Sequence, residues 1–257
     1  MQDNRPVLRK WIQIVDHMVN FVAALFFGLL LAYGIYGMWD SAQINKQADA
    51  SLYETYKPTA KNSLSFAELQ KINSDVFGWL TVDKTHINYP LVQTEDNAKY
   101  VNTDVKGQFS LAGSIFLDCN NKKDFSDINN IIYGHHMAKD AMFGELEYFE
   151  EPKYFEEHSY GKLYYDGEWH KVEFFAFVHA DAYDNVLYNT SLNNRLEYLD
   201  YVKEHAKYLK KTSFDDNERY VTLSTCTSES TNGRHLLIGR ILENTADEKG
   251  EPQYEEK

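Results

Sequence analysis

The feature that most constrains this chain is an uncharged apolar run near its N-terminus. Residues 18–39 read MVNFVAALFFGLLLAYGIYGMW and contain no Asp, Glu, Lys or Arg. As a helix, the run would rise about 33 Å, which matches the hydrocarbon thickness of a bilayer. It is apolar on every face, whereas a helix packed on a soluble core has one apolar stripe. The sequence therefore predicts a transmembrane helix at 18–39.

The charges beside this run predict its orientation. Arg5, Arg9 and Lys10 precede it, and Asp40 follows it. Under the positive-inside rule, residues 1–17 are cytoplasmic, and the chain after the helix is extracellular. The protein is thus expected to be a single-pass protein of the cell membrane. A cleaved signal peptide is the alternative, but the run is longer than a typical signal core and no clear cleavage site follows it. We therefore expect an uncleaved anchor.

The rest of the chain divides into three predicted segments. Residues 40–64 form a polar stalk or linker, or else the start of packed helices. Residues 65–242 carry the apolar runs of one folded domain, and 43% of the whole chain is hydrophobic, which is enough for a core. Residues 243–257 are polar and acidic, so we expect a disordered tail. The net charge of −13 argues against nucleic acid as a partner, because phosphate contacts need clustered Lys and Arg.

Short apolar runs bounded by turn residues dominate the folded domain. The clearest hairpin is predicted over 161–182, turning at Asp166–Gly167, and the clearest helix over 191–211, where leucine, valine and alanine recur at spacings of three and four. No alternation of strands with helices appears, so a parallel sheet is not expected. The pattern favours a mainly β fold, a barrel or sandwich decorated with helices. Other strands are predicted at 78–83, 86–92, 113–118, 130–134, 219–226 and 234–242.

The last two predicted strands bring a cysteine and an arginine together. Cys226 ends the run TLSTC, and Arg234 follows the seven-residue loop 227–233. In a hairpin these two side chains lie opposite each other, and Thr222 and Ser224 share the face of Cys226 because strand side chains alternate. An arginine there can favour a thiolate and donate hydrogen bonds to an oxyanion. The alternative is a buried cysteine beside a solvated arginine.

A cysteine nucleophile also needs a base or an imidazolium partner. Among nine histidines, His135 and His136 directly follow an apolar strand and a glycine, a position at the rim of a sheet where sites often form. The alternative is an exposed loop pair. We expect no metal here, because adjacent histidines point apart on a strand and no spaced carboxylate or cysteine cluster accompanies them. No cofactor is expected either.

The second cysteine, Cys119, ranks below Cys226 as a nucleophile. It lies in a polar turn after GSIFLD and has no strand-paired arginine. Two cysteines do not make a disulfide framework, and the sequence alone does not place these two within bridging distance.

Together these motifs resemble the sortase family. TLSTC followed by Arg234, YGHH upstream and an anchor before both occur in the family's order and spacing. The spans GWLTVD…INYPLVQ, GSIFLD and IIYGHHM…MFGEL are similar to class B sortases in particular, as is the helix 191–211 before the cysteine strand. The resemblance covers about residues 65–242. It implies an eight-stranded β-barrel with flanking helices.

The resemblance also implies an activity. Sortases are cysteine transpeptidases that join secreted proteins, through a C-terminal sorting signal, to an amine of a peptidoglycan precursor or a pilin on the Gram-positive cell surface. By position, the catalytic residues are His135, Cys226 and Arg234. Ser224 would line the substrate groove, and Thr225 would help to shape the oxyanion site through its backbone or its hydroxyl. Two other functions stay open on the residues alone: a Cys–His hydrolase that uses only water, and a non-catalytic surface-binding domain.

Overall fold

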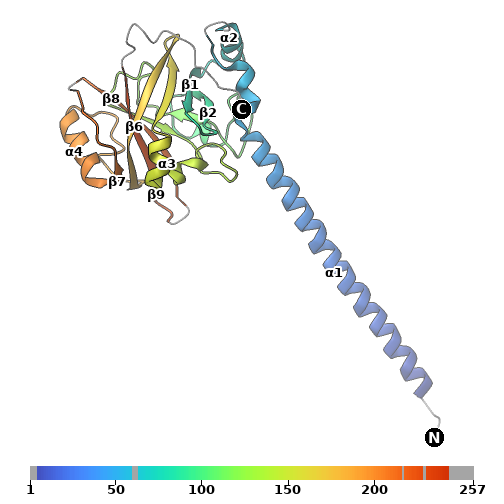
Figure 1. Ribbon diagram of the computed structural model, residues 1–257. Coiled ribbons are helices and arrows are strands. Elements are labelled where there is room, and N and C mark those ends of the chain that lie inside the picture. Colours follow the sequence, from blue (N-terminus) through green and yellow to red (C-terminus); the bar gives the residue numbers. More distant parts are fainter. Residues whose placement is uncertain (1–4, 60–62, 216, 228–229, 243–257) are drawn as a thin grey trace. The chain divides into compact units, whose positions relative to one another are not determined.

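The computed structural model describes residues 5–59, 63–215, 217–227 and 230–242 (Figure 1). The predicted tail 243–257 lies outside these residues. Two compact units divide the chain, Met1–Ile44 and Asn45–Lys257. The helices are α1 (Arg5–Gln47), η1 (Ala50–Tyr56), α2 (Ser63–Ile72), η2 (Lys99–Val101), η3 (Gly144–Glu150), α3 (Pro152–Glu157) and α4 (Arg195–His205). The strands are β1 (Val76–Val82), β2 (Asn88–Val92), β3 (Ile115–Leu117), β4 (Asn129–Tyr133), β5 (Tyr160–Tyr165), β6 (Glu168–Asp181), β7 (Ala206–Leu209), β8 (Arg219–Cys226) and β9 (Gly233–Ile241).

The first unit is the N-terminal part of helix α1. In the described part of the chain, this is the one helix that is long and apolar enough to cross a membrane, with a mean hydropathy of 2.1 in its most apolar window. No side chain in that window is buried inside the protein. Length and composition therefore agree with the span predicted at 18–39.

The second unit is a closed β-barrel. Eight strands form a ring in the order β5-β1-β2-β3-β4-β8-β9-β6, which the pairing of β6 with β5 closes, and β7 pairs with β6 beyond the residues that pair with β5. The predicted hairpin is present, with Asp166 at φ 51° and Gly167 at φ 84° in its turn. Positive φ at both central residues gives the turn whose twist matches paired strands. The eight-stranded barrel predicted from the family resemblance is confirmed.

Two strand pairs of the barrel are parallel. β2 pairs with β3, and β4 with β8, in parallel. Parallel neighbours need a long crossover connection. The segment between β2 and β3 supplies one, and β5, β6, β7 and α4 lie between β4 and β8 in the chain. The other ring pairs are antiparallel, so the sheet is mixed and not a parallel sheet, as the sequence predicted.

The barrel is packed on both of its faces. Its interior holds Leu223 of β8 and Leu237 of β9, both fully buried in the largest apolar cluster. The alternate residues of these strands, including Tyr220 and Leu236, face outward into a second cluster that α4 covers. This alternation decides which side chains of the strand ends face the interior and which face outward.

The helix predicted at 191–211 is shorter in the structure. Asn194 caps α4 with its side-chain oxygen on the amide of Glu197, at 3.2 Å, and the helix ends at His205. Residues 206–209 instead form β7 and hydrogen-bond to the edge of β6. Leu196 is 63% exposed, although the leucine spacing predicted it on the buried face. A free strand edge offers the backbone a partner that helical periodicity does not record.

Residues after α1 pack onto the barrel. The carbonyl of Ala48 accepts a hydrogen bond from the hydroxyl of Tyr89 at 2.9 Å. Tyr53 of η1 is only 4% exposed, in a cluster with Trp79 and Tyr100. Of the two interpretations of the polar segment, packed helical structure therefore describes residues 48–56.

Candidate active site

Strand register places the predicted nucleophile opposite the predicted arginine. Cys226, the last residue of β8, pairs with Arg234 near the start of β9. Residues directly opposite in an antiparallel pair point to the same side. Cys226 is exposed and is a free thiol. A substrate can therefore reach its sulfur from the outer face of the barrel.

His135, the third predicted catalytic residue, lies on the same face of the barrel, on the opposite side of Cys226 from Arg234. β4 and β8 run in parallel with Tyr133 beside Ser224, and the amide of Gly134 still donates to the carbonyl of Ser224 at 3.1 Å. His135 and Cys226 each lie two residues beyond this pair, so both point outward. The strand ends thus bring His135, Cys226 and Arg234 into one row, with the cysteine in the middle. We call this set the catalytic row, after the role that the sequence resemblance implies for it.

Two contacts orient His135. Its ring Nε2 lies 2.8 Å from the carbonyl oxygen of Val101, and its own carbonyl accepts from the amide of Phe143 at 3.0 Å. A carbonyl only accepts, so Nε2 carries the proton that it shares with Val101. Nδ1 is then the ring nitrogen without that proton, and it can accept a hydrogen bond.

The neighbouring histidine has a different setting. Nε2 of His136 lies 3.7 Å from a carboxylate oxygen of Glu147 on η3, and its backbone forms a bridge with Met142. These contacts hold His136 against η3. Of the two histidines that the sequence singled out, the structure therefore brings His135 into the catalytic row.

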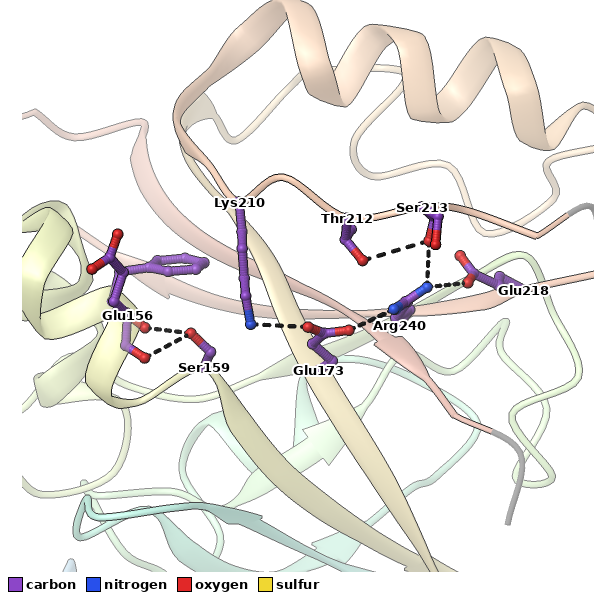
Figure 2. Close-up of polar contacts among 9 residues, drawn as sticks. Glu156, Ser159, Glu173, Lys210, Thr212, Ser213, Glu218 and Arg240 are labelled. Atoms are coloured by element: carbon purple, nitrogen blue, oxygen red, sulfur yellow. Dashed lines mark hydrogen bonds and ion pairs between the residues drawn. The ribbon is translucent and has the colours of Figure 1, made fainter. Parts of the chain in front are cut away.

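Arg234 and Arg240 lie on the same strand in different surroundings. Nη1 of Arg234 donates to the carbonyl of Gly233 at 2.8 Å, and the side chain has no carboxylate partner among the described residues. Arg240 donates to Glu173 and Glu218, each at 2.6 Å, and Lys210 holds the other oxygen of Glu173 at 2.9 Å (Figure 2). Burial alone would lower the pKa of Arg240, but the hydrogen bonds to the two carboxylates raise it. Arg240 is therefore structural, while Arg234 keeps its charge for an incoming group.

The two arginines predict opposite phenotypes. Arg234→Ala is expected to lower kcat by about 100- to 1000-fold, the usual effect of removing an oxyanion donor, with an unchanged melting temperature. Arg240→Ala leaves Glu218, whose side chain is only 11% exposed, without its cation and leaves Glu173 with Lys210 alone, so we expect the free energy of unfolding to fall by about 3 kcal/mol. Steady-state kinetics and thermal unfolding of both variants check this. A stable, fully active Arg234→Ala enzyme would contradict the assignment.

Ser224 lies on the predicted face but beneath another side chain. It is 2% exposed, and its hydroxyl lies 2.8 Å from the hydroxyl of Tyr188, in the segment between β6 and α4. Burial and the nearby Cys226 raise the pKa of Tyr188, to about 12, whereas Ser224 and Arg234 lower it. Tyr188 also stacks on Tyr133, with ring centroids 6.4 Å apart. Ser224 therefore supports Tyr188, which is the residue that faces the site.

Sequence reasoning missed Tyr188 because it lies in a segment with no strand or helix periodicity.

We expect Ser224→Ala and Tyr188→Phe to reduce kcat/KM by similar factors of about fivefold, since each removes the same hydrogen bond. The double variant should lose no more than either single variant. Independent effects that multiply in the double variant would show that the shared bond is not what matters.

Thr225 points away from the catalytic row. Its side chain is 2% exposed inside the barrel, and its hydroxyl has no hydrogen-bond partner in the described part of the chain. The hydroxyl therefore cannot meet a substrate on the outer face. A contribution of Thr225 to an oxyanion site is left to its backbone amide.

Cys119, the second cysteine, lies in surroundings that do not activate its thiol. It is a free thiol, and burial together with the charge of Asp118 raises its pKa. A raised pKa leaves less thiolate at neutral pH. This agrees with the prediction that Cys119 ranks below Cys226 as a nucleophile.

Known proteins are similar to this chain in sequence and in fold. A family model described as the sortase domain matches residues 80–241. Sortase B of Listeria monocytogenes is 33% identical over 180 residues, which cover 68% of this chain and 73% of that protein. The crystal structure of a class B sortase of Streptococcus pyogenes involved in pilus biogenesis is 40% identical, with a TM-score of 0.65 over 69% of this chain and 97% of that one. Sortase B of B. anthracis has a TM-score of 0.70 and 28% identity, covering 80% of this chain and all of its own (100%).

Proposed function

The chain belongs to the sortase family as a class B cysteine transpeptidase, and from that premise we propose that it cleaves a sorting signal after threonine and joins the new carboxyl end to an amine. The observation that carries the proposal is the catalytic row, in which Cys226 stands between His135 and Arg234 at neighbouring strand ends. A nucleophile, an acid–base group and a cation on one exposed face meet the needs of acyl transfer.

In the first half of the proposed reaction, Cys226 as the thiolate attacks the carbonyl carbon of the threonine, with His135 as the imidazolium. The S–C bond forms, Arg234 donates hydrogen bonds to the oxyanion, and His135 gives a proton to the leaving amine as the C–N bond breaks. The product is a thioester on Cys226. In the second half, an acceptor amine attacks the thioester, His135 takes the amine's proton, and the Cys226 thiolate leaves.

The acceptor is proposed to be an amine of a peptidoglycan precursor or of a pilin. Two similar structures support amine and peptide chemistry: a sortase B complexed with triglycine, at 25% identity, and a complex of Staphylococcus aureus sortase B with its substrate, also at 25%. The similar S. pyogenes enzyme is involved in pilus biogenesis. Secreted proteins with a C-terminal sorting signal would be the acyl donors.

The proposed location is the outer face of the cell membrane. The apolar part of α1 would be the anchor, and the positive residues before it would keep residues 1–17 in the cytoplasm. The barrel would then lie outside, where both secreted proteins and cell-wall amines are found. The anchor would hold the enzyme close to these two substrates.

Product analysis separates this function from a hydrolase. The full chain in detergent is incubated with a library of peptides that carry candidate sorting signals, with and without triglycine. A transpeptidase gives an amide between the cleaved peptide and triglycine, whereas a hydrolase gives only the free acid. Products that stay free acids at saturating triglycine and at saturating concentrations of a lysine peptide would refute the proposal.

A further inference from the structure

At one end of the barrel, on its interior side, three side chains that could bind a metal ion lie close together: Glu150, His179 and His235. We call this group the lip cluster. Nitrogen and oxygen atoms of these three side chains lie within 4.8 Å of one another. His179 on β6 pairs directly with His235 on β9, and their ring centroids are 4.8 Å apart. Glu150 is the last residue of η3. Three segments that are distant in the sequence thus converge on one point.

We propose that this lip cluster binds Zn²⁺. Two imidazoles and one carboxylate are a donor set that zinc uses with water in its fourth position. Tetrahedral zinc with ligands at about 2.1 Å places neighbouring ligand atoms about 3.4 Å apart. Distances of up to 4.8 Å in the lip cluster must therefore shorten by up to about 1.4 Å. The side chains of Glu150 and His179 are 36% and 35% exposed, so they are free to move towards a bound ion.

The carboxylate of Glu150 is already turned towards the histidines. Its Oε1 is paired with Lys207 of β7, while its Oε2 lies 3.9 Å from Nε2 of His179. Oε2 can therefore bind zinc while Oε1 keeps its lysine. The charge of Lys207 repels a cation, so this lysine sets the affinity lower than the three ligands alone would give.

The lip cluster is separate from the catalytic row although both involve β9. His235 follows Arg234 directly and is 6% exposed, on the interior side of the strand. Its partner across the pair with β8 is Thr225, the residue whose buried hydroxyl has no partner in the described part of the chain. Cross-strand neighbours share one side of a sheet. The Thr225 hydroxyl therefore faces the same space as the His235 ring and offers a hydrogen bond to a zinc-bound water.

Zinc at this point would tie three elements together. It would join the end of η3 to β6 and β9, and η3 follows the loop that carries His135. A ligand that binds only the folded state raises its stability by mass action. At a free Zn²⁺ concentration a hundredfold above Kd, we expect the melting temperature to rise by about 5 °C or more.

The test uses the full chain in detergent with Cys226→Ala, because a thiolate in the catalytic row would itself bind zinc. Calorimetric titration with Zn²⁺ should show one site per chain. Co²⁺ should give the visible absorption of a four-coordinate ion without a thiolate charge-transfer band. Adding His179→Ala or Glu150→Gln should weaken binding at least tenfold, and Lys207→Met should tighten it severalfold.

His205 provides the matched control. It is an exposed histidine on α4 whose ring contacts its own helix, through the carbonyl of Tyr201 at 2.9 Å and the Tyr201 ring. His205→Ala should leave zinc affinity unchanged. The proposal is overturned if the Cys226→Ala chain shows no saturable binding, or if His179→Ala binds zinc as tightly as its parent. Because the parent already lacks the nucleophile, either result is independent of the transpeptidase proposal.

Discussion

Replacing Cys226 with alanine is expected to abolish cleavage of a sorting-signal peptide, with a loss in kcat/KM of at least about 10⁴-fold. In the proposed mechanism, Cys226 supplies the atom that forms the acyl-enzyme, and no other group in the catalytic row can replace it. The side chain is exposed at a strand end, so the substitution should leave the fold and the melting temperature unchanged. Cleavage rates with equal concentrations of folded enzyme measure the effect.

Cys119→Ala is the matched control for this prediction. Its thiol has a raised pKa and lies outside the catalytic row, so the variant should keep full activity. A thiol-specific alkylating reagent should also label Cys226 faster than Cys119 in the native enzyme. If Cys226→Ala retained activity while Cys119→Ala lost it, the nucleophile would be misassigned.

His135→Ala is expected to reduce the rate of both half-reactions by about 10²- to 10⁴-fold, the range for loss of a general acid–base group. The leaving amine would no longer receive a proton, and the acceptor amine would no longer lose one. Rates of peptide cleavage and of amine transfer, measured separately, check the two roles. An equal loss in both is the expected pattern.

His136→Ala is the corresponding control. Its ring is held against Glu147 and lies outside the catalytic row, so we expect less than about a threefold change in either rate. A large loss in His136→Ala with near-normal rates in His135→Ala would mean that the acid–base group is the second histidine. The register of β4 against β8 would then be a poor guide to the site.

The pair of Cys226 and Arg234 could be predicted because its geometry is local. A seven-residue loop joins two runs with strand alternation, and a hairpin brings their ends together. The place of His135 is different. It depends on parallel pairing between β4 and β8, which lie far apart in the chain. Single-residue patterns do not encode such pairing. The local pattern singled out His135 and His136 at a strand end, and only the family resemblance selected His135 as the partner of Cys226.

The sequence predictions failed where tertiary contacts decide the outcome. Residues 206–209 continue the spacing of a helix, but the open edge of β6 draws them into β7. Ser224 was placed on the correct face by alternation, yet its cover, Tyr188, comes from an irregular segment 36 positions away. Thr225 shows the reverse case: the hydroxyl that the family resemblance offered for the oxyanion site faces into the barrel, as strand alternation alone indicates.

The most direct test of the central claim is intact-protein mass spectrometry of the enzyme with a cleavable sorting-signal peptide. We predict one covalent adduct with the mass of the acyl fragment, located on Cys226 by digestion. Adding triglycine should discharge this adduct and release an amide product of matching mass. An enzyme that cleaves the peptide without any adduct on Cys226, or an adduct that triglycine does not discharge, would contradict the account.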